Sequence, residues 1–242
     1  MSERSLGKLL DTDDPAWPLV CQWIADARNA VETLPVERTV GEQTLLFLQV
    51  TAHSPLGALA LESGGIVIDH GWLRLLGAGS GRLQDGLCEW NQRAVAQIGE
   101  RQARYPELCL VAHDAAGGFF ALNGGAWDGR PSSVFYFAPD TLRWEDLGTS
   151  YSGFLQWALA GDLAQFYATM HWPEWERDVA AIADDQGYSI YPPLWMQGEP
   201  IADRSRQAVP MRELWGVQMD FARQLATVPD STNVRIHVTD GE

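Results

Sequence analysis

Residues 108–167 place the strongest constraint on the fold. Three short apolar runs lie in the first part of this stretch, at residues 108–112, 119–122 and 134–137, and glycine, asparagine, aspartate and proline separate them. Short runs rich in β-branched and aromatic residues between such breaks are typical of strands joined by tight loops. Ser150 then precedes an apolar helical pattern, and serine is a favoured N-cap residue. We therefore predict a group of central strands followed by a helix.

The preceding residues predict several helices and one hairpin. Helical spacing and capping residues predict helices over residues 17–31, 56–62 and 87–104. For residues 42–51, periodicity does not distinguish a helix from a buried strand, and we favour the helix. Residues 66–69 and 72–76 are predicted to be strands joined at His70-Gly71, a link compatible with a tight hairpin.

The last third of the chain is mainly helical in pattern. Helices are predicted over residues 150–161, 162–167, 172–187 and 210–225, a loop over 197–207, and strands over 188–191 and 234–238. Strands are thus grouped centrally and helices surround them, which is not a regular βαβ order. This arrangement predicts an α+β fold.

Four sequence segments resemble the bacterial family of unknown function DUF2625. They read SPLGALALESGG, IDHGWLRLLGAGSG, GGFFALNGGAW and VFYFAPDTLRWEDLG, and the likeness covers nearly the whole chain. The middle third is also similar to SUKH proteins, through its Gly-Gly turn, its Val-Phe-Tyr-Phe strand and the pattern Ser-x-x-x-Phe-Leu-x-Trp. This second resemblance implies a mostly antiparallel central sheet with surrounding helices. It also implies a single domain, residues 1–242, with a SUKH-like core at 41–160 and a C-terminal helical extension at 161–242 packed on it.

The charge of the chain favours some partners over others. There are 17 basic and 32 acidic residues, which gives a formal net charge of −15. Such a balance opposes binding to nucleic acid or to an anionic membrane, because phosphate contacts need clustered lysine and arginine. It permits attraction to a basic protein partner, although solubility alone also explains a net negative charge.

The cysteines and the N-terminus indicate a cytoplasmic location. Cys21, Cys88 and Cys109 are odd in number and widely spaced, so we expect small buried residues in a reducing compartment rather than disulfides. The N-terminal residues have no long apolar core of the kind found in a signal peptide. No apolar run is long enough to span a bilayer.

Two adjacent acid–imidazole pairs are the main candidates for chemistry. Asp69-His70 and His113-Asp114 each lie at the end of a predicted strand. If the two strand ends meet, the pairs are able to hold a divalent metal or to act as acid and base. However, adjacent residues of a strand point to opposite faces, so neither pair chelates a metal by itself. The ordinary alternative is that the aspartates make turn hydrogen bonds.

Several tryptophans lie in or beside predicted loops, where an aromatic residue among acids is typical of a protein interface. We name Trp72, Trp127 and Trp144 as candidate binding residues, together with Asp69, His70, His113 and Asp114. The glycine loop 77–81 lacks the third Rossmann glycine and a Gly-Lys-Ser/Thr ending, which makes nucleotide binding a weak alternative to a plain loop.

No set of residues in the sequence forms a coherent catalytic group, and no metal or cofactor is assigned. SUKH members include immunity proteins that bind toxins, so that resemblance implies binding more than catalysis. We therefore expect a non-enzymatic protein-binding module of an immunity or regulatory type. The alternative is an enzyme, or a binder of a small ligand or metal, that uses Asp69/His70 and His113/Asp114.

Overall fold

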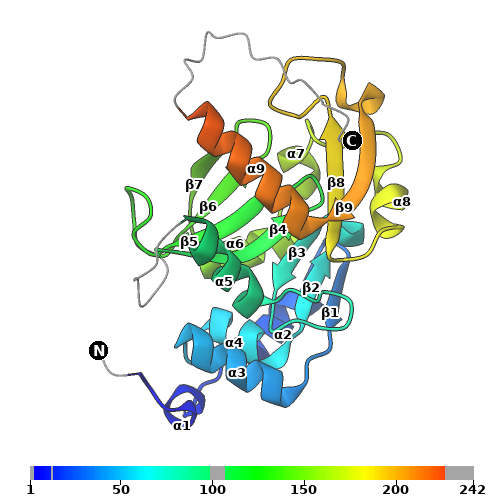
Figure 1. Cartoon of the computed structure of the whole chain (residues 1–242). Helices are drawn as coiled ribbons and strands as arrows, with labels where there is room; N and C mark the ends of the chain where they lie inside the picture. Colours follow the sequence, from blue (N-terminus) through cyan, green and yellow to red (C-terminus); the bar gives the residue numbers. More distant parts are fainter. Residues whose placement is uncertain (1–2, 12, 99–106, 227–242) are drawn as a thin grey trace.

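The fold is α+β and is built on one antiparallel sheet (Figure 1). The computed structural model describes residues 3–11, 13–98 and 107–226. Neighbouring strands in this sheet are also consecutive in the chain, in the order β1 to β7. The strands are β1 (Val31–Leu34), β2 (Gly65–Ile68), β3 (Leu73–Leu76), β4 (Leu108–Asp114), β5 (Phe119–Asn123), β6 (Ser133–Ala138) and β7 (Arg143–Ser150).

A separate two-stranded antiparallel sheet follows, formed by β8 (Gln186–Tyr191) and β9 (Ser205–Pro210). The α-helices and 3₁₀ turns in the described residues are α1 (Leu6–Leu10), α2 (Trp17–Ala25), α3 (Arg38–Leu48), α4 (Pro55–Glu62), η1 (Asp69–Gly71), α5 (Leu87–Ile98), α6 (Tyr151–Ala160), α7 (Leu163–Phe166), α8 (Trp175–Ala180), η2 (Ile201–Asp203) and α9 (Met211–Leu225).

The two faces of the large sheet are covered by different helices. Phe120 on β5 packs against Phe154 of α6, with ring centroids 4.8 Å apart. Its neighbour Phe119 points to the opposite face and packs against Trp215 of α9 and Trp90 of α5, at 4.7 and 5.5 Å. Figure 1 shows α5 and α9 on the near side of the sheet and α6 behind it.

One row of side chains crosses the near face of the sheet. Residues directly opposite one another in antiparallel strands point to the same face, so the pairing register defines this row. Its members, in order from β1 to β7, are Glu32, Val67, Arg74, His113, Phe119, Phe137 and Trp144. A buried arginine and a buried histidine therefore lie side by side in an otherwise apolar sheet centre.

The helix start predicted at Ser150 is confirmed, and Ser54 and Asp162 cap two further helices. Ser54 accepts a hydrogen bond from Gly57 N at the start of α4, Ser150 accepts one from Gly153 N at the start of α6, and Asp162 caps α7. The helix favoured for residues 42–51 is also confirmed, as α3. The proposed division into residues 41–160 and 161–242 stays a prediction.

Other sequence predictions are wrong in their extent. The helix predicted over residues 17–31 ends at Ala25, and Val31 instead begins β1, where it pairs with Ile68. The loop predicted over residues 197–207 contains the start of β9, which pairs with β8. Cys21, expected to be buried, is exposed. The predicted strand 234–238 and the end of the predicted helix 87–104 lie outside the described residues.

Candidate functional site

A cleft opens at one end of the sheet, next to the hairpin between β2 and β3. Its volume is about 540 Å³. Its walls come from the chain around β1, the η1 turn, the loop after β3 and the segment between α8 and β8. The lining residues used below are Glu32, Val67, His70, Gly71, Arg82, Val179, Asp184 and Asp185.

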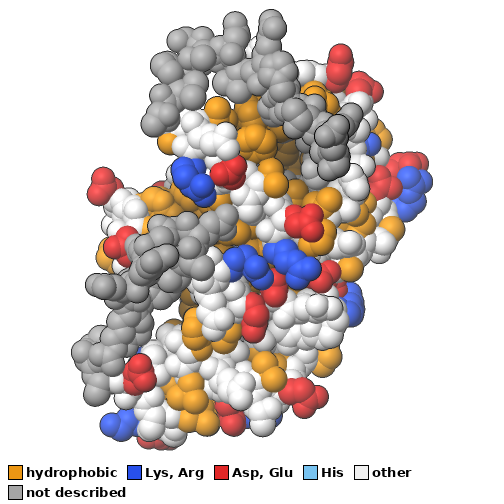
Figure 2. All heavy atoms as spheres, viewed as in Figure 1, with side chains coloured by type: hydrophobic (Ala, Val, Ile, Leu, Met, Phe, Trp, Pro, Cys, Tyr) orange, Lys and Arg blue, Asp and Glu red, His pale blue; other side chains and the backbone are white. Residues whose placement is uncertain are grey.

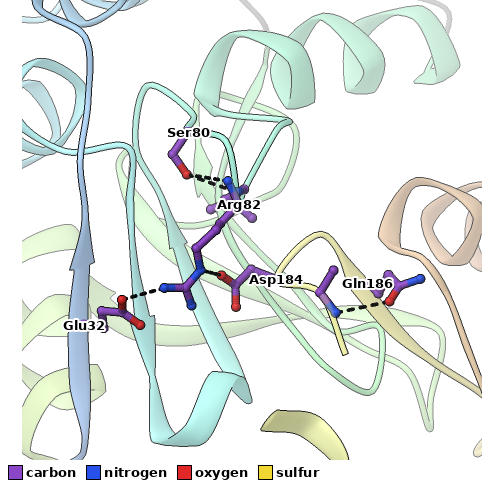
Figure 3. Close-up of polar contacts among 7 residues, drawn as sticks. Glu32, Ser80, Arg82, Asp184 and Gln186 are labelled. Carbon is purple, nitrogen blue, oxygen red and sulfur yellow. Dashed lines mark hydrogen bonds and ion pairs between the residues drawn. The ribbon is translucent and has the colours of Figure 1, made fainter. Parts of the chain in front are cut away.

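Arg82 forms an ionic bridge across one side of the cleft (Figure 3). Its Nη1 lies 2.5 Å from Glu32 Oε1 on β1, and its Nε lies 2.9 Å from Asp184 Oδ2 before β8. The loop that carries Arg82 is held by Ser80 Oγ, which accepts hydrogen bonds from the backbone N–H groups of Arg82 and Leu83. The bridge thus joins segments that are distant in the sequence.

The glycine-rich loop that precedes Arg82 is shaped by close backbone packing. A Cβ atom at Gly77 would lie 2.3 Å from the carbonyl oxygen of Ser63, so only glycine fits there. Gly77 O accepts a hydrogen bond from Leu87 N at the start of α5. These contacts explain Gly77 without a bound nucleotide.

The η1 turn at the cleft has an unusual backbone. Asp69 and His70 have φ values of 53° and 58°, and Gly71 follows at 91°. Consecutive non-glycine residues in this left-handed region carry strain that the surrounding structure must offset, and such strain is frequent at functional sites. Helix α8 packs on this turn, and the His70 ring lies edge-on to Trp175 with centroids 6.2 Å apart. Burial is the main cause that raises the pKa of Asp69.

Arg74 is not in the lining of the cleft but lies next to Gly71, which is. Its side chain is 0% exposed, and none of its three nitrogens donates a hydrogen bond to a described residue. Burial lowers the pKa of Arg74 to about 10, while the charges of Asp184, Asp114 and Asp185 act in the opposite direction. The guanidinium is therefore still protonated at pH 7. A buried charge without a hydrogen-bonding partner is costly, so the position of Arg74 requires an explanation.

Asp185 contributes a carboxylate that no described residue pairs with. It is half-buried and lies in the wall of the cleft. It also lines a second, much smaller cavity of about 20 Å³, together with His113 and Trp90. The cleft and this small cavity thus share Asp185, whose charge also acts on Arg74.

The second acid–imidazole pair is brought to the same end of the sheet but is not exposed. Leu73, three residues after His70, pairs with Asp114, and Arg74 pairs with His113. Burial and the charge of Arg74 lower the pKa of His113 well below its usual value. Asp114 is fully buried and accepts hydrogen bonds from Tyr136 Oη, Ala116 N and Gly118 N. These contacts match the turn role that was the ordinary alternative.

The predicted aromatic residues are found in different environments. Trp72 is 0% exposed and packs edge-on against His171, with centroids 4.4 Å apart, so it lies in the core. Trp127 and Trp144 are half-buried and contact each other at 4.7 Å, near the edge strand β7. This pair lies at the opposite edge of the sheet from the cleft.

The geometry brings His70 to the cleft but leaves the other predicted residues elsewhere. Within residues 3–11, 13–98 and 107–226, no group of three or more histidine, cysteine, aspartate and glutamate side chains has the arrangement of a metal site. The sequence predictions missed Glu32, Arg82, Asp184 and Asp185, which are distant in the chain. Arg74 was detectable in principle, because it is a charged residue inside the apolar run 72–76.

Basic side chains lie in the middle of the near surface with acidic side chains around them (Figure 2). Apolar side chains gather above them on the same face.

In the part of the chain that the structure describes, every helix is too short or too polar to cross a membrane.

Comparison with known proteins identifies the family. The chain is 43% identical over 220 residues to the putative uncharacterized protein YbfG of Escherichia coli K12. The matched region covers 89% of this chain and 95% of YbfG. The chain is 36% identical over 222 residues to an uncharacterized protein of Haemophilus influenzae, which covers 91% of this chain and 95% of that protein. The family model for DUF2625, a protein family of unknown function, matches residues 6–214. The chain therefore belongs to the DUF2625 family.

Proposed function

We propose that the protein is a non-enzymatic protein-binding module, of an immunity or regulatory type, and that its cleft receives a basic group of the partner. The cleft has a volume of about 540 Å³ and its charged lining is mainly acidic. Glu32 and Asp184 are already paired with Arg82, whereas Asp185 is not paired. The Asp185 carboxylate, which lines the cleft and forms no ion pair or hydrogen bond with a described residue, is the single observation that carries this proposal.

The net charge of the chain supports the same function at longer range. A formal charge of −15 attracts a basic protein before contact, and such attraction raises the association rate. At contact, a lysine or arginine of the partner exchanges water for the Asp185 carboxylate in a partly enclosed site. A charge-assisted hydrogen bond in such a site contributes about 1.5–3 kcal/mol. The proposal places the protein in the cytoplasm and requires no cofactor.

The test begins with affinity capture from the native host and identification of the captured protein by mass spectrometry. The purified partner is then used to measure association rates over a range of salt concentrations. We expect the rate to fall as salt rises, because screening shortens the range of the attraction. An association rate that does not depend on salt would refute the electrostatic part of the proposal.

Two matched variants locate the binding surface. Asp185→Asn removes the free charge in the cleft, while Asp140→Asn removes an exposed charge in the turn between β6 and β7, at the other edge of the sheet. We expect Asp185→Asn to weaken the captured complex about tenfold, and Asp140→Asn to leave its affinity within twofold. Equal affinities for the two variants would exclude the cleft as the binding surface.

A second candidate function is binding of a small ligand or a metal, with or without catalysis, by the Asp69/His70 and His113/Asp114 pairs. The observation that favours it is the strained turn that presents His70 to the cleft. Elemental analysis of freshly purified wild-type protein and of His70→Ala tests the metal form. A stoichiometric metal that is lost in the variant supports it, and wild-type protein that contains no metal removes it.

A further inference from the structure

Resting on the proposed function, we infer that the cleft also contains a carboxylate-binding position at Arg74. Its occupant therefore carries a carboxylate next to a cationic group. This chemistry occurs in the C-terminal arginine or lysine of a protein and in a free basic amino acid. The carboxylate contacts Arg74 at the floor of the cleft, and the cationic group contacts Asp185 in the wall.

The position of Gly71 connects Arg74 to the cleft. A Cβ atom built on Gly71 would have three nearest neighbours, namely Val179 Cγ1 at 3.6 Å, Val67 Cγ1 at 3.8 Å and Arg74 Nη2 at 4.0 Å. Gly71, Val67 and Val179 all line the cleft. Gly71 therefore places no side chain over this part of the floor, and one nitrogen of Arg74 lies just beneath it, beside two valine side chains.

This arrangement is maintained by the backbone as well as by the packing. Gly71 has a φ of 91°, a conformation that side-chain-bearing residues rarely adopt. The two residues before it are also left-handed, so the turn holds Gly71 directly over Arg74. The strained turn thus keeps a residue without a side chain between the cleft and Arg74.

The guanidinium is suited to a carboxylate. It has five N–H donors in a planar fork that matches the two oxygens of a carboxylate. Described residues accept none of these donors, although the side chain is fully buried. A carboxylate at this position neutralises a buried charge and satisfies its hydrogen bonds at the same time.

The charge of the cleft selects a carboxylate over a phosphate. Glu32, Asp184 and Asp185 lie in the lining, so a group with about two negative charges meets more repulsion than a group with one. An occupant that also carries a positive charge offsets this repulsion through Asp185. The same acidic lining that attracts a basic partner therefore favours an occupant with both charges.

The experiment compares three probes by isothermal titration calorimetry on the full-length protein. The first is a hexapeptide of glycine, serine and alanine that ends in arginine with a free carboxylate, the second is the same peptide with an amidated C-terminus, and the third is free arginine. We expect wild-type protein to bind the free-carboxylate peptide or free arginine at least tenfold more tightly than the amidated peptide. The stronger of these two probes identifies the source of the carboxylate.

Variants assign the effect to Arg74. Arg74→Met removes the guanidinium and keeps an apolar side chain of similar length, and we expect it to bind all three probes with equal affinity. Arg74→Lys keeps the charge without the fork and is expected to retain part of the preference. Arg223→Met, a matched change at an exposed position of α9, is expected to behave as wild type. Thermal unfolding establishes that each variant is folded.

Three outcomes overturn the inference. Equal affinity of wild-type protein for the free and amidated peptides refutes the carboxylate position, while the proposed binding of a basic group stands. No binding of any probe also refutes it, and the proposed function is then judged separately, by the effect of Asp185→Asn on the captured protein. A preference that survives in Arg74→Met assigns the carboxylate to another residue.

Discussion

Replacing Asp114 by alanine tests whether this residue is a structural anchor of the sheet. The carboxylate accepts three hydrogen bonds, from Tyr136 Oη at 2.7 Å, Gly118 N at 2.8 Å and Ala116 N at 3.0 Å. All of these donors are buried with it, in the turn between β4 and β5 or on β6. Asp114→Ala leaves the three donors without their acceptor.

The expected loss follows from the cost of buried, unpaired donors. Each such donor costs about 1–3 kcal/mol, so three donors cost about 3–9 kcal/mol. Burial raises the pKa of Asp114, which shows that the charged carboxylate is itself partly unfavourable, and its removal returns some of this cost. We therefore expect the lower part of the range, about 3–5 kcal/mol. This is a large part of the stability of an ordinary domain, about 5–15 kcal/mol.

Urea unfolding followed by tryptophan fluorescence measures the loss. Asp114→Asn is the matched control, because its side-chain oxygen still accepts from the two backbone N–H groups, and we expect a loss of about 1–2 kcal/mol. An Asp114→Ala protein within about 1 kcal/mol of wild type would refute the anchoring role. It would also reopen a functional role for the His113-Asp114 pair.

Three further predictions rest on local contacts. Ser150→Ala removes the acceptor for Gly153 N and is expected to lower the free energy of unfolding by about 1 kcal/mol, as measured by urea unfolding. Burial lowers the pKa of His171 from 6.5 to about 4, so the folded state binds fewer protons than the unfolded state between these values. The free energy of unfolding should therefore fall as pH decreases from about 6.5 towards 4, and a His171→Gln variant that shows the same fall would contradict this. Burial raises the pKa of Cys109 to about 12, whereas Cys21 is exposed, so maleimide at pH 7.5 should label Cys21 rapidly and leave Cys109 unmodified by mass spectrometry.

Local sequence patterns were sufficient to predict structure where a residue makes its contacts within its own segment of the chain. Ser54 and Ser150 cap helices because their hydroxyls accept from backbone groups three residues later, and this depends only on nearby sequence. The end of the helix predicted over residues 17–31 was not predictable in this way. Val31 fits a helical stripe equally well, and its place in β1 depends on pairing with Ile68, which is distant in the sequence.

The candidate site depends on contacts between residues that are distant in the sequence. Glu32, Arg82 and Asp184 come from three separated segments, and only the folded chain places them within hydrogen-bonding distance. His70 was named from its neighbour Asp69, but it lines the cleft together with the segment before β8 rather than with His113-Asp114. Sequence spacing does not encode such proximity, because the intervening loops determine which strand ends meet.

By itself, the sequence determined the α+β class, the family and most helix starts, since these follow from periodicity, capping and motifs within short windows. The tertiary structure alone decided that Arg74 is buried under Gly71 and that Asp185 is left unpaired. The physical reason is that burial and pairing of a charge depend on every segment packed around it. The free energy of a charged group is set by those surroundings and not by its neighbours in the chain.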